Sequence, residues 1–243
     1  MSQSVKRAAR IIDSIADEPK SVVQLADEFE LHRSTMFREL QALEEVGYAR
    51  RRKDGTYTLG FHLVALAQSS LESIDLREVA SAHLRRMHKV VGNTVHLAAL
   101  MDSAIIYVDK VEDASGVRMY SRVGAPVRTH CSGVGKAILA NLDEPRRDAV
   151  LATTDWAKYT EKTITTREAL DVELERIAEQ GWAVDDGEFE DFVNCVAVPI
   201  ISRAGVVGAL SLTAIRMAED LEMLKTRLPL MQQTAAQIAR ELG

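Results

Sequence analysis

Residues 21–60 have the sequence SVVQLADEFELHRSTMFRELQALEEVGYARRRKDGTYTLG, and this stretch decides the architecture of the first part of the chain. Its opening tetrapeptide, SVVQ, has the form of a capping box. In that motif the serine hydroxyl accepts from a free backbone N–H, and the side chain three residues later accepts from the serine N–H. A helix is therefore predicted to begin at Ser21, and apolar residues at helical spacing extend it to Phe29.

A second helix is predicted over residues 32–46. Its inward stripe consists of apolar residues three and four positions apart, namely Met36, Phe37, Leu40 and Leu43. Its outward face carries cationic and hydroxyl side chains, which bind phosphates and read base edges. The candidate DNA-binding residues on this helix are Arg33, Ser34, Thr35 and Arg38.

Residues 48–59 are predicted to form two short strands, because Gly47 can end the preceding helix and Asp54-Gly55 favours a hairpin turn. Residues 50–53 are four consecutive cations, of which the candidate DNA contacts are Arg51, Arg52 and Lys53. Such a run alone is usually a solvated face of a hairpin. Beside this helix pair it favours a winged helix-turn-helix, with the second helix in the major groove and the wing over the backbone or minor groove.

Residues 4–17 are predicted to add a helix whose apolar face packs beneath the other two: Val5, Ala8, Ile11, Ile12 and Ile15. The cations Lys6, Arg7 and Arg10 fall outside this face, where they could meet phosphates. We therefore expect residues 1–60 to form one DNA-binding domain.

The charge balance supports a division of labour within the chain of 243 residues. The net charge is −6, but residues 1–60 contain ten Lys/Arg and ten Asp/Glu, so the remaining 20 cations and 26 anions hold the whole deficit. Binding depends on the local field at the phosphates, which the clustered cations supply. The acidic remainder is expected to lie away from the duplex.

The sequence predicts a cytoplasmic protein with a sizeable core and no membrane contact. Hydrophobic residues make up 47 %, no apolar run reaches about 18 residues, and the N-terminus has the pattern of an amphipathic helix rather than of a signal peptide. The two cysteines, Cys131 and Cys195, cannot build a disulfide framework, which agrees with a reducing compartment.

Residues 61–91 are predicted to form linker and dimerisation helices. The first has a possible seam at Val64, Ala67, Leu71 and Ile74, which suits either a dimer contact or packing within one subunit. The second is capped by Asp75 and closed by Gly92.

Residues 92–243 are predicted to form an α+β domain in which a central antiparallel sheet supports a ligand pocket. Strands are expected at 94–100, 105–108, 117–120, 182–185, 193–201 and 206–213. Helices are expected at 133–141, 144–152 and 167–180, with a long final helix over 218–242, bent at Pro229.

The segment GAPVRTHCSGVGKAILA, residues 124–140, invites comparison with a phosphate-binding P-loop. It lacks the first glycine of that motif, which is His130 here, and Ala137 replaces the Ser/Thr that would hold magnesium. What remains is a glycine-rich loop that enters a helix N-terminus, an arrangement that suits a carboxylate. The alternative is that the glycines only permit close packing of the helix on the sheet.

This segment, together with GWAVDDGEFE at 181–190 and NCVAVP at 194–199, resembles the signature of the IclR family of bacterial transcriptional regulators. The resemblance spans nearly the whole chain. It implies a GAF-like effector-binding domain for a small organic acid, joined by a linker helix to the winged helix-turn-helix. It also implies a homodimer or a dimer of dimers on a pseudo-palindromic operator.

The family's effector contacts match seven positions of this sequence: Met119, Gly133, Val134, Asp185, Cys195, Ser211 and Thr213. The chain departs from the commonest family pattern at Arg128, where many members have an apolar residue, and at Asn194. Arg128 could add a cation to a carboxylate site, or it could be exposed to solvent; we favour exposure.

Other kinds of chemistry have weaker support in the sequence. Cys131 or Cys195 beside His130 or His96 could form a nucleophile or a zinc site, but a free cysteine is more often a small apolar filler. The acidic run at 185–191 could hold paired catalytic carboxylates, but a solvated loop is the favoured interpretation. We therefore predict no catalytic residue, no metal and no cofactor.

The sequence thus predicts a transcription factor that controls a catabolic operon and responds to a sugar-derived or aromatic acid. One alternative is a DNA-binding protein whose second domain only oligomerises. A less favoured alternative is a cysteine hydrolase fused to a DNA-binding module.

Overall fold

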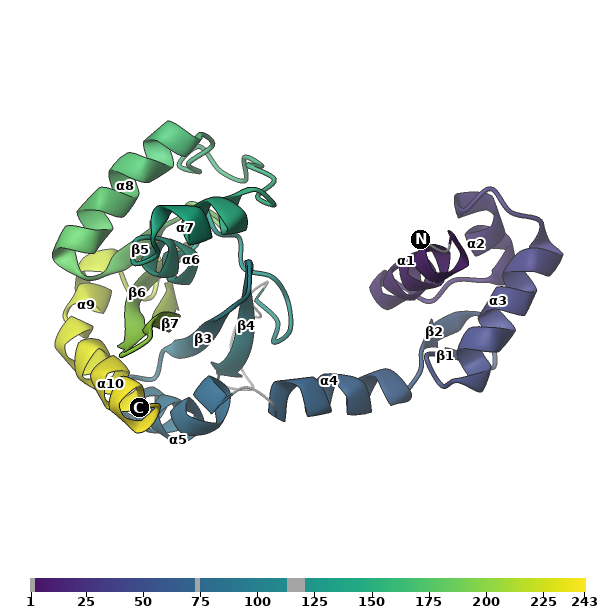
Figure 1. Cartoon of the computed structure of the whole chain (residues 1–243), viewed down its shortest axis with the longest axis horizontal. Helices are drawn as coiled ribbons and strands as arrows, with labels where there is room; N and C mark the ends of the chain where they lie inside the picture. The colour runs from purple at the N-terminus through teal and green to yellow at the C-terminus, as the bar shows by residue number, and fades with distance from the viewer. Residues whose placement is uncertain (1–2, 73–74, 113–120) are drawn as a thin grey trace. The chain divides into compact units, whose positions relative to one another are not determined.

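The computed structural model describes residues 3–72, 75–112 and 121–243 (Figure 1). The chain divides into two compact units, Met1–Ser73 and Ile74–Gly243. Each unit has a hydrophobic core of its own. Across the described ranges, every helix is too short or too polar to span a bilayer.

The first unit is a winged helix-turn-helix, as predicted. Its elements are α1 (Gln3–Asp17), α2 (Val22–Glu28), α3 (Arg33–Glu45), β1 (Ala49–Arg51), β2 (Tyr57–Leu59) and α4 (His62–Glu72). The capping box is present, because Ser21 Oγ accepts from the Gln24 N–H at 3.3 Å and the Ser21 N–H donates to Gln24 Oε1 at 2.8 Å. The two strands pair antiparallel, with Arg50 opposite Thr58.

The wing is fastened to the helices by its second strand. The Tyr57 N–H donates to the Lys20 carbonyl at 2.7 Å, and the Lys20 N–H donates to the Tyr57 carbonyl at 3.1 Å. The Tyr57 ring is buried in the same core as Ile11, Leu25 and Leu40. Burial of each such aliphatic side chain contributes roughly 1.5–3 kcal/mol, so this small core can hold the three helices and the wing together.

Two expectations for the core of this unit are wrong. Val5 is 69 % exposed and Phe37 is 38 % exposed, so neither belongs to the core. Arg7 is paired with Glu39, since its Nε donates to Glu39 Oε1 at 2.7 Å and thereby joins α1 to α3. The apolar stripe of α3 is therefore narrower than predicted and consists of Met36, Leu40 and Leu43.

The second unit is an α+β domain with a five-stranded antiparallel sheet in the order β4-β3-β7-β6-β5. Its strands are β3 (Thr94–Met101), β4 (Ala104–Val111), β5 (Ala183–Asp186), β6 (Val193–Ser202) and β7 (Gly205–Ile215). Its helices are α5 (Asp75–Val91), α6 (Gly133–Leu139), α7 (Glu144–Leu151), α8 (Arg167–Gln180), α9 (Leu221–Lys225) and α10 (Leu228–Glu241).

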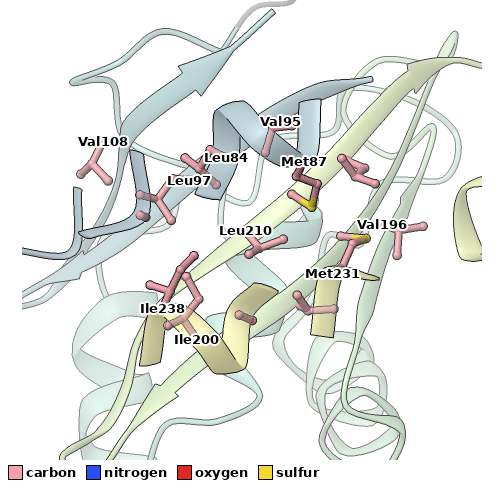
Figure 2. Close-up of a cluster of buried hydrophobic side chains, with 14 of the residues drawn as sticks. Leu84, Met87, Val95, Leu97, Val108, Val196, Ile200, Leu210, Met231 and Ile238 are labelled. Atoms are coloured by element: carbon pink, nitrogen blue, oxygen red, sulfur yellow. The ribbon is translucent and has the colours of Figure 1, made fainter. Parts of the chain in front are cut away.

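The sheet lies between two helical layers (Figure 1). On one face, α5 and α10 pack against the strands, as Figure 2 shows for Leu84 and Met87 of α5 and for Met231 and Ile238 of α10. On the other face, α6 and α8 cover the sheet with a second cluster that includes Ile138 and Leu174. The glycine loop thus belongs to the second layer.

Two elements differ from expectation. We had grouped α5 with the linker, but its apolar face belongs to the core of the second unit. The expectation of one long helix over 218–242 is wrong, because α9 and α10 are separate helices. Pro229 lies in the first turn of α10, where its missing N–H would have no helical partner anyway. The strand predicted at 117–120 lies outside the described residues.

Candidate DNA-contacting face and ligand cavity

Helix α3 presents the predicted DNA-contacting side chains to solvent. Arg33, Ser34, Thr35 and Arg38 are all exposed. Its N-terminus is capped by His32, whose Nδ1 lies 2.7 Å from Ser34 Oγ and accepts from the Ser34 N–H at 3.3 Å. The buried face of α3 fixes the helix on the unit, so its cationic face is held outward.

The wing carries its cations on the surface as well. Arg51, Arg52 and Lys53 are exposed. The Arg51 N–H donates to Glu44 Oε1 at 3.2 Å, which joins the wing to α3, and the Arg50 guanidinium lies 5.1 Å from the centre of the Phe61 ring. Both groups of candidate DNA contacts therefore sit on one fixed frame.

The second unit contains a cavity between the sheet and the glycine loop, with about 630 Å³ of space free of atoms, its open mouth included. Six of the seven residues predicted as effector contacts line it: Gly133, Val134, Asp185, Cys195, Ser211 and Thr213. The seventh, Met119, lies outside the described residues. Their role in binding an effector stays a prediction.

The strand register explains how segments distant in sequence meet in this cavity. Asp185 lies opposite Cys195, Cys195 lies opposite Thr213, and His96 lies opposite Ser211. Directly opposite residues share a face of the sheet, and so do residues two apart on one strand. The five side chains therefore line one wall of the cavity.

Glycine is required where α6 meets this wall. A Cβ on Gly133 would lie 3.0 Å from Cys195 Sγ and 3.2 Å from the Ala197 Cβ. Ser132 caps the helix, since its Oγ accepts from the Gly135 N–H at 3.2 Å. The close-packing role of the glycines is thus present, and the same approach brings Gly133 and Val134 to the cavity.

Burial shifts the pKa values of two titratable groups that line the cavity. Burial, helped by the negative charge of Glu188, raises the pKa of Asp185 to about 7. Burial, helped by the Lys110 ammonium, lowers the pKa of His96 to about 3. Neutral His96 lies between two hydroxyl groups, with Nε2 2.7 Å from Ser121 Oγ and Nδ1 3.3 Å from Thr213 Oγ1.

The structure adds lining residues that the sequence prediction missed: His96, Tyr107, Ser121, Ala125, Pro126, Ser132, Phe189, Glu190 and Val193. Arg128 lines the cavity too, although its side chain is half exposed. Its guanidinium donates to Asp155 Oδ2 at 3.1 Å and lies 5.7 Å from the centre of the Tyr159 ring. The hydroxyl-bearing and aromatic residues come from strands and loops whose pairing the sequence did not reveal.

The acidic run is not the solvated loop that we expected, because Asp185 and Glu188 are both buried.

The two cysteines are poor nucleophiles. Burial is the main cause that raises the pKa of Cys195 to about 12 and that raises the pKa of Cys131, so both thiols are protonated at pH 7. Among the described residues, no group of three or more His, Cys, Asp or Glu side chains is placed to hold a metal ion.

The sequence and the fold match known proteins along the whole chain. The model of the IclR helix-turn-helix domain matches residues 4–53, and the model of the C-terminal domain of the bacterial transcriptional regulator IclR matches residues 68–240. The chain is 30 % identical over 245 residues to the HTH-type transcriptional regulator KdgR of Escherichia coli K12, an alignment that covers 99 % of this chain and 92 % of KdgR.

Two solved structures extend the comparison. The crystal structure of the Thermotoga maritima IclR matches with a TM-score of 0.81 and 32 % identity over 98 % of each chain. An IclR homologue from Microbacterium hydrocarbonoxydans, complexed with 4-hydroxybenzoate, has the same fold, with a TM-score of 0.82 and 24 % identity over 99 % of each chain. The chain therefore belongs to the IclR family of DNA-binding transcriptional regulators and is not an enzyme.

Proposed function

We propose that this regulator binds a small organic acid in the cavity of its second unit and that occupancy of the cavity controls its affinity for an operator. The observation that carries the proposal is the lining of the cavity, which brings the α6 residues Gly133 and Val134 together with the hydroxyl-bearing residues Ser211 and Thr213. An acid offers a carboxylate for N–H and O–H donors and a body for apolar walls such as Phe189. The 4-hydroxybenzoate bound by the homologue of the same fold is a ligand of this class.

We propose further that two copies bind a pseudo-palindromic operator in the cytoplasm, where they control a catabolic operon as a dimer or a dimer of dimers. Support comes from α4, on which Val64 and Ala67 of the predicted seam are both exposed. These two residues are three positions apart and so lie on one side of the helix, where a second α4 would cover them. Because a ligand shifts an equilibrium only when it prefers one state, the acid must favour one arrangement of the two DNA-contacting modules.

Ligand binding is tested by thermal shift with three acids, namely 4-hydroxybenzoate, D-gluconate and L-lactate. At 100 times its dissociation constant, an acid that binds only the folded state adds about 2.7 kcal/mol to the free energy of unfolding and so raises the melting temperature. The neutral amide of the same acid is the control and should give a smaller shift. No shift with any of the three acids would favour a second domain that only oligomerises.

The DNA-contacting residues are tested by paired substitutions. Arg38→Ala on α3 should weaken operator binding more than non-specific binding, because base contacts carry the sequence information. Arg51→Ala or Arg52→Ala should weaken both and lower the salt slope of log K by about 0.9, which is one phosphate contact. Fluorescence anisotropy measures the affinity and its salt slope on DNA from upstream of the gene that encodes this chain and on shuffled DNA.

Lys158→Ala is the matched control, because Lys158 is an exposed cation of the second unit paired with Glu161 at 2.8 Å. It should change neither affinity nor salt slope. Equal losses on both DNA sequences for all three arginine variants would contradict the separate roles of α3 and the wing.

A further inference from the structure

Lys136 is the charged residue of the GVGKA run at 133–137, and neither the cavity lining nor the DNA-contacting face accounts for it. Its side chain is 0 % exposed, and it does not line the cavity. Its Nζ donates to Glu188 Oε2 at 2.6 Å, and Glu173 Oε1 lies 3.9 Å away. A buried ammonium requires such a partner, because removing an unpaired charge from water is very unfavourable.

Glu188 belongs to the short segment after β5 whose next two residues, Phe189 and Glu190, line the cavity. The segment is held by hydrogen bonds on several sides. The Glu188 N–H donates to Asp185 Oδ1 at 2.6 Å, and Thr163 Oγ1 donates to the Glu188 carbonyl at 2.6 Å. The charged end of Glu188 reaches Lys136 on α6.

The ion pair therefore joins two walls of the same cavity. One wall is the start of α6, where Gly133 and Val134 lie less than one turn before Lys136. The other is the segment with Phe189 and Glu190. We propose that Lys136 and Glu188 are positioning residues of the ligand cavity, which fix the spacing of these walls without contacting the ligand. The inference rests on the proposed acid-binding function for its effect on affinity, but not for its effect on the segment itself.

The test replaces the pair by apolar side chains of similar size, in the variant K136M/E188M. Replacement of both charges by apolar groups usually preserves stability, whereas removal of one leaves a buried charge unpaired. We expect the double variant to keep its melting temperature within a few degrees. Amides of residues 187–190 should exchange hydrogen about tenfold faster, because local opening becomes easier. Affinity for the acid that shifts the wild type most should fall about tenfold.

Two further variants make the outcome decisive. Lys162→Met breaks an exposed ion pair to Asp186 in the same region, 2.7 Å long, and should change neither exchange at 187–190 nor affinity. Thr163→Val removes the hydroxyl that holds the Glu188 carbonyl without altering any charge, and it should speed exchange at the same amides. It supplies the measurement if the double variant does not fold.

The two proposals fail in different ways. If the wild type binds none of the three acids, the acid-binding function fails, while the exchange measurement still decides whether Lys136 and Glu188 fix the segment. A stable double variant with wild-type exchange at 187–190 and wild-type affinity would overturn the positioning role. A general loss of protection over the whole unit in both variants, without preference for residues 187–190, would also overturn it.

Discussion

Gly60→Ala is expected to destabilise the N-terminal unit by more than about 3 kcal/mol and to abolish operator binding, which places it among the most damaging single substitutions. A Cβ on Gly60 would lie 2.0 Å from the Gly47 carbonyl oxygen and 2.9 Å from the Tyr48 carbonyl carbon. Both are backbone atoms, so no side-chain rotation relieves the overlap. The close contact between these two backbone segments also allows the Gly60 N–H to donate to the Tyr48 carbonyl at 2.9 Å.

Thermal unfolding followed by far-ultraviolet circular dichroism, with anisotropy on operator DNA, measures both effects of Gly60→Ala. Gly55→Ala at the tip of the wing is the control. Gly55 has a φ of +84°, but the nearest atom to an added Cβ is the mobile end of Arg51 at 3.9 Å. The substitution Gly55→Ala therefore introduces backbone strain alone, which lowers the free energy of unfolding by about 1 kcal/mol. If both variants bound operator equally well, the close contact of Gly60 with Gly47 would not control the fold of this unit.

The first unit could be predicted well because its signals are local. The capping box at Ser21, the helix stop at Gly47 and the Asp54-Gly55 turn each act within a few residues, and each is present in the structure. The errors at Val5 and Phe37 concern which apolar residue is covered. That outcome depends on how far neighbouring helices extend, which helical periodicity does not encode.

The cavity could be predicted only in part because it is assembled by strand pairing. The resemblance to the family placed Asp185, Cys195 and Thr213 together, and the register of β5, β6 and β7 confirms that they are neighbours. His96 enters through the pairing of β3 with β7, between segments more than 100 residues apart. Glu188 was assigned to solvent because its partner, Lys136, lies 52 positions away in sequence.

Asp185→Asn is expected to stabilise the second unit increasingly as pH rises from 4 to 7. In the folded chain the pKa of Asp185 is raised to about 7, above its unfolded value of about 3.9, so the folded state holds a proton that the unfolded state releases. The contribution of Asp185 to the free energy of unfolding is therefore greatest below pH 4. Between pH 4 and pH 7 the free energy of unfolding of the wild type falls, relative to that of the asparagine variant, by up to about 1.4 kcal/mol per pH unit. Denaturant unfolding of both proteins at pH 4.5, 6 and 7.5 measures the difference.

The same proton should also govern binding of an acid, because Asp185 lines the cavity. Two carboxylates in one buried site repel each other, so an anionic ligand favours the protonated form of Asp185. Affinity of the wild type should fall by up to about tenfold per pH unit above pH 7, whereas that of Asp185→Asn should stay flat. The variant keeps a carbonyl oxygen that can accept from the Glu188 N–H, so the turn after β5 can persist. Calorimetry in two buffers of different ionisation enthalpy measures the proton uptake directly. Equal uptake by both proteins would place the titrating group elsewhere, and Glu190 would then be the next carboxyl of the cavity to substitute.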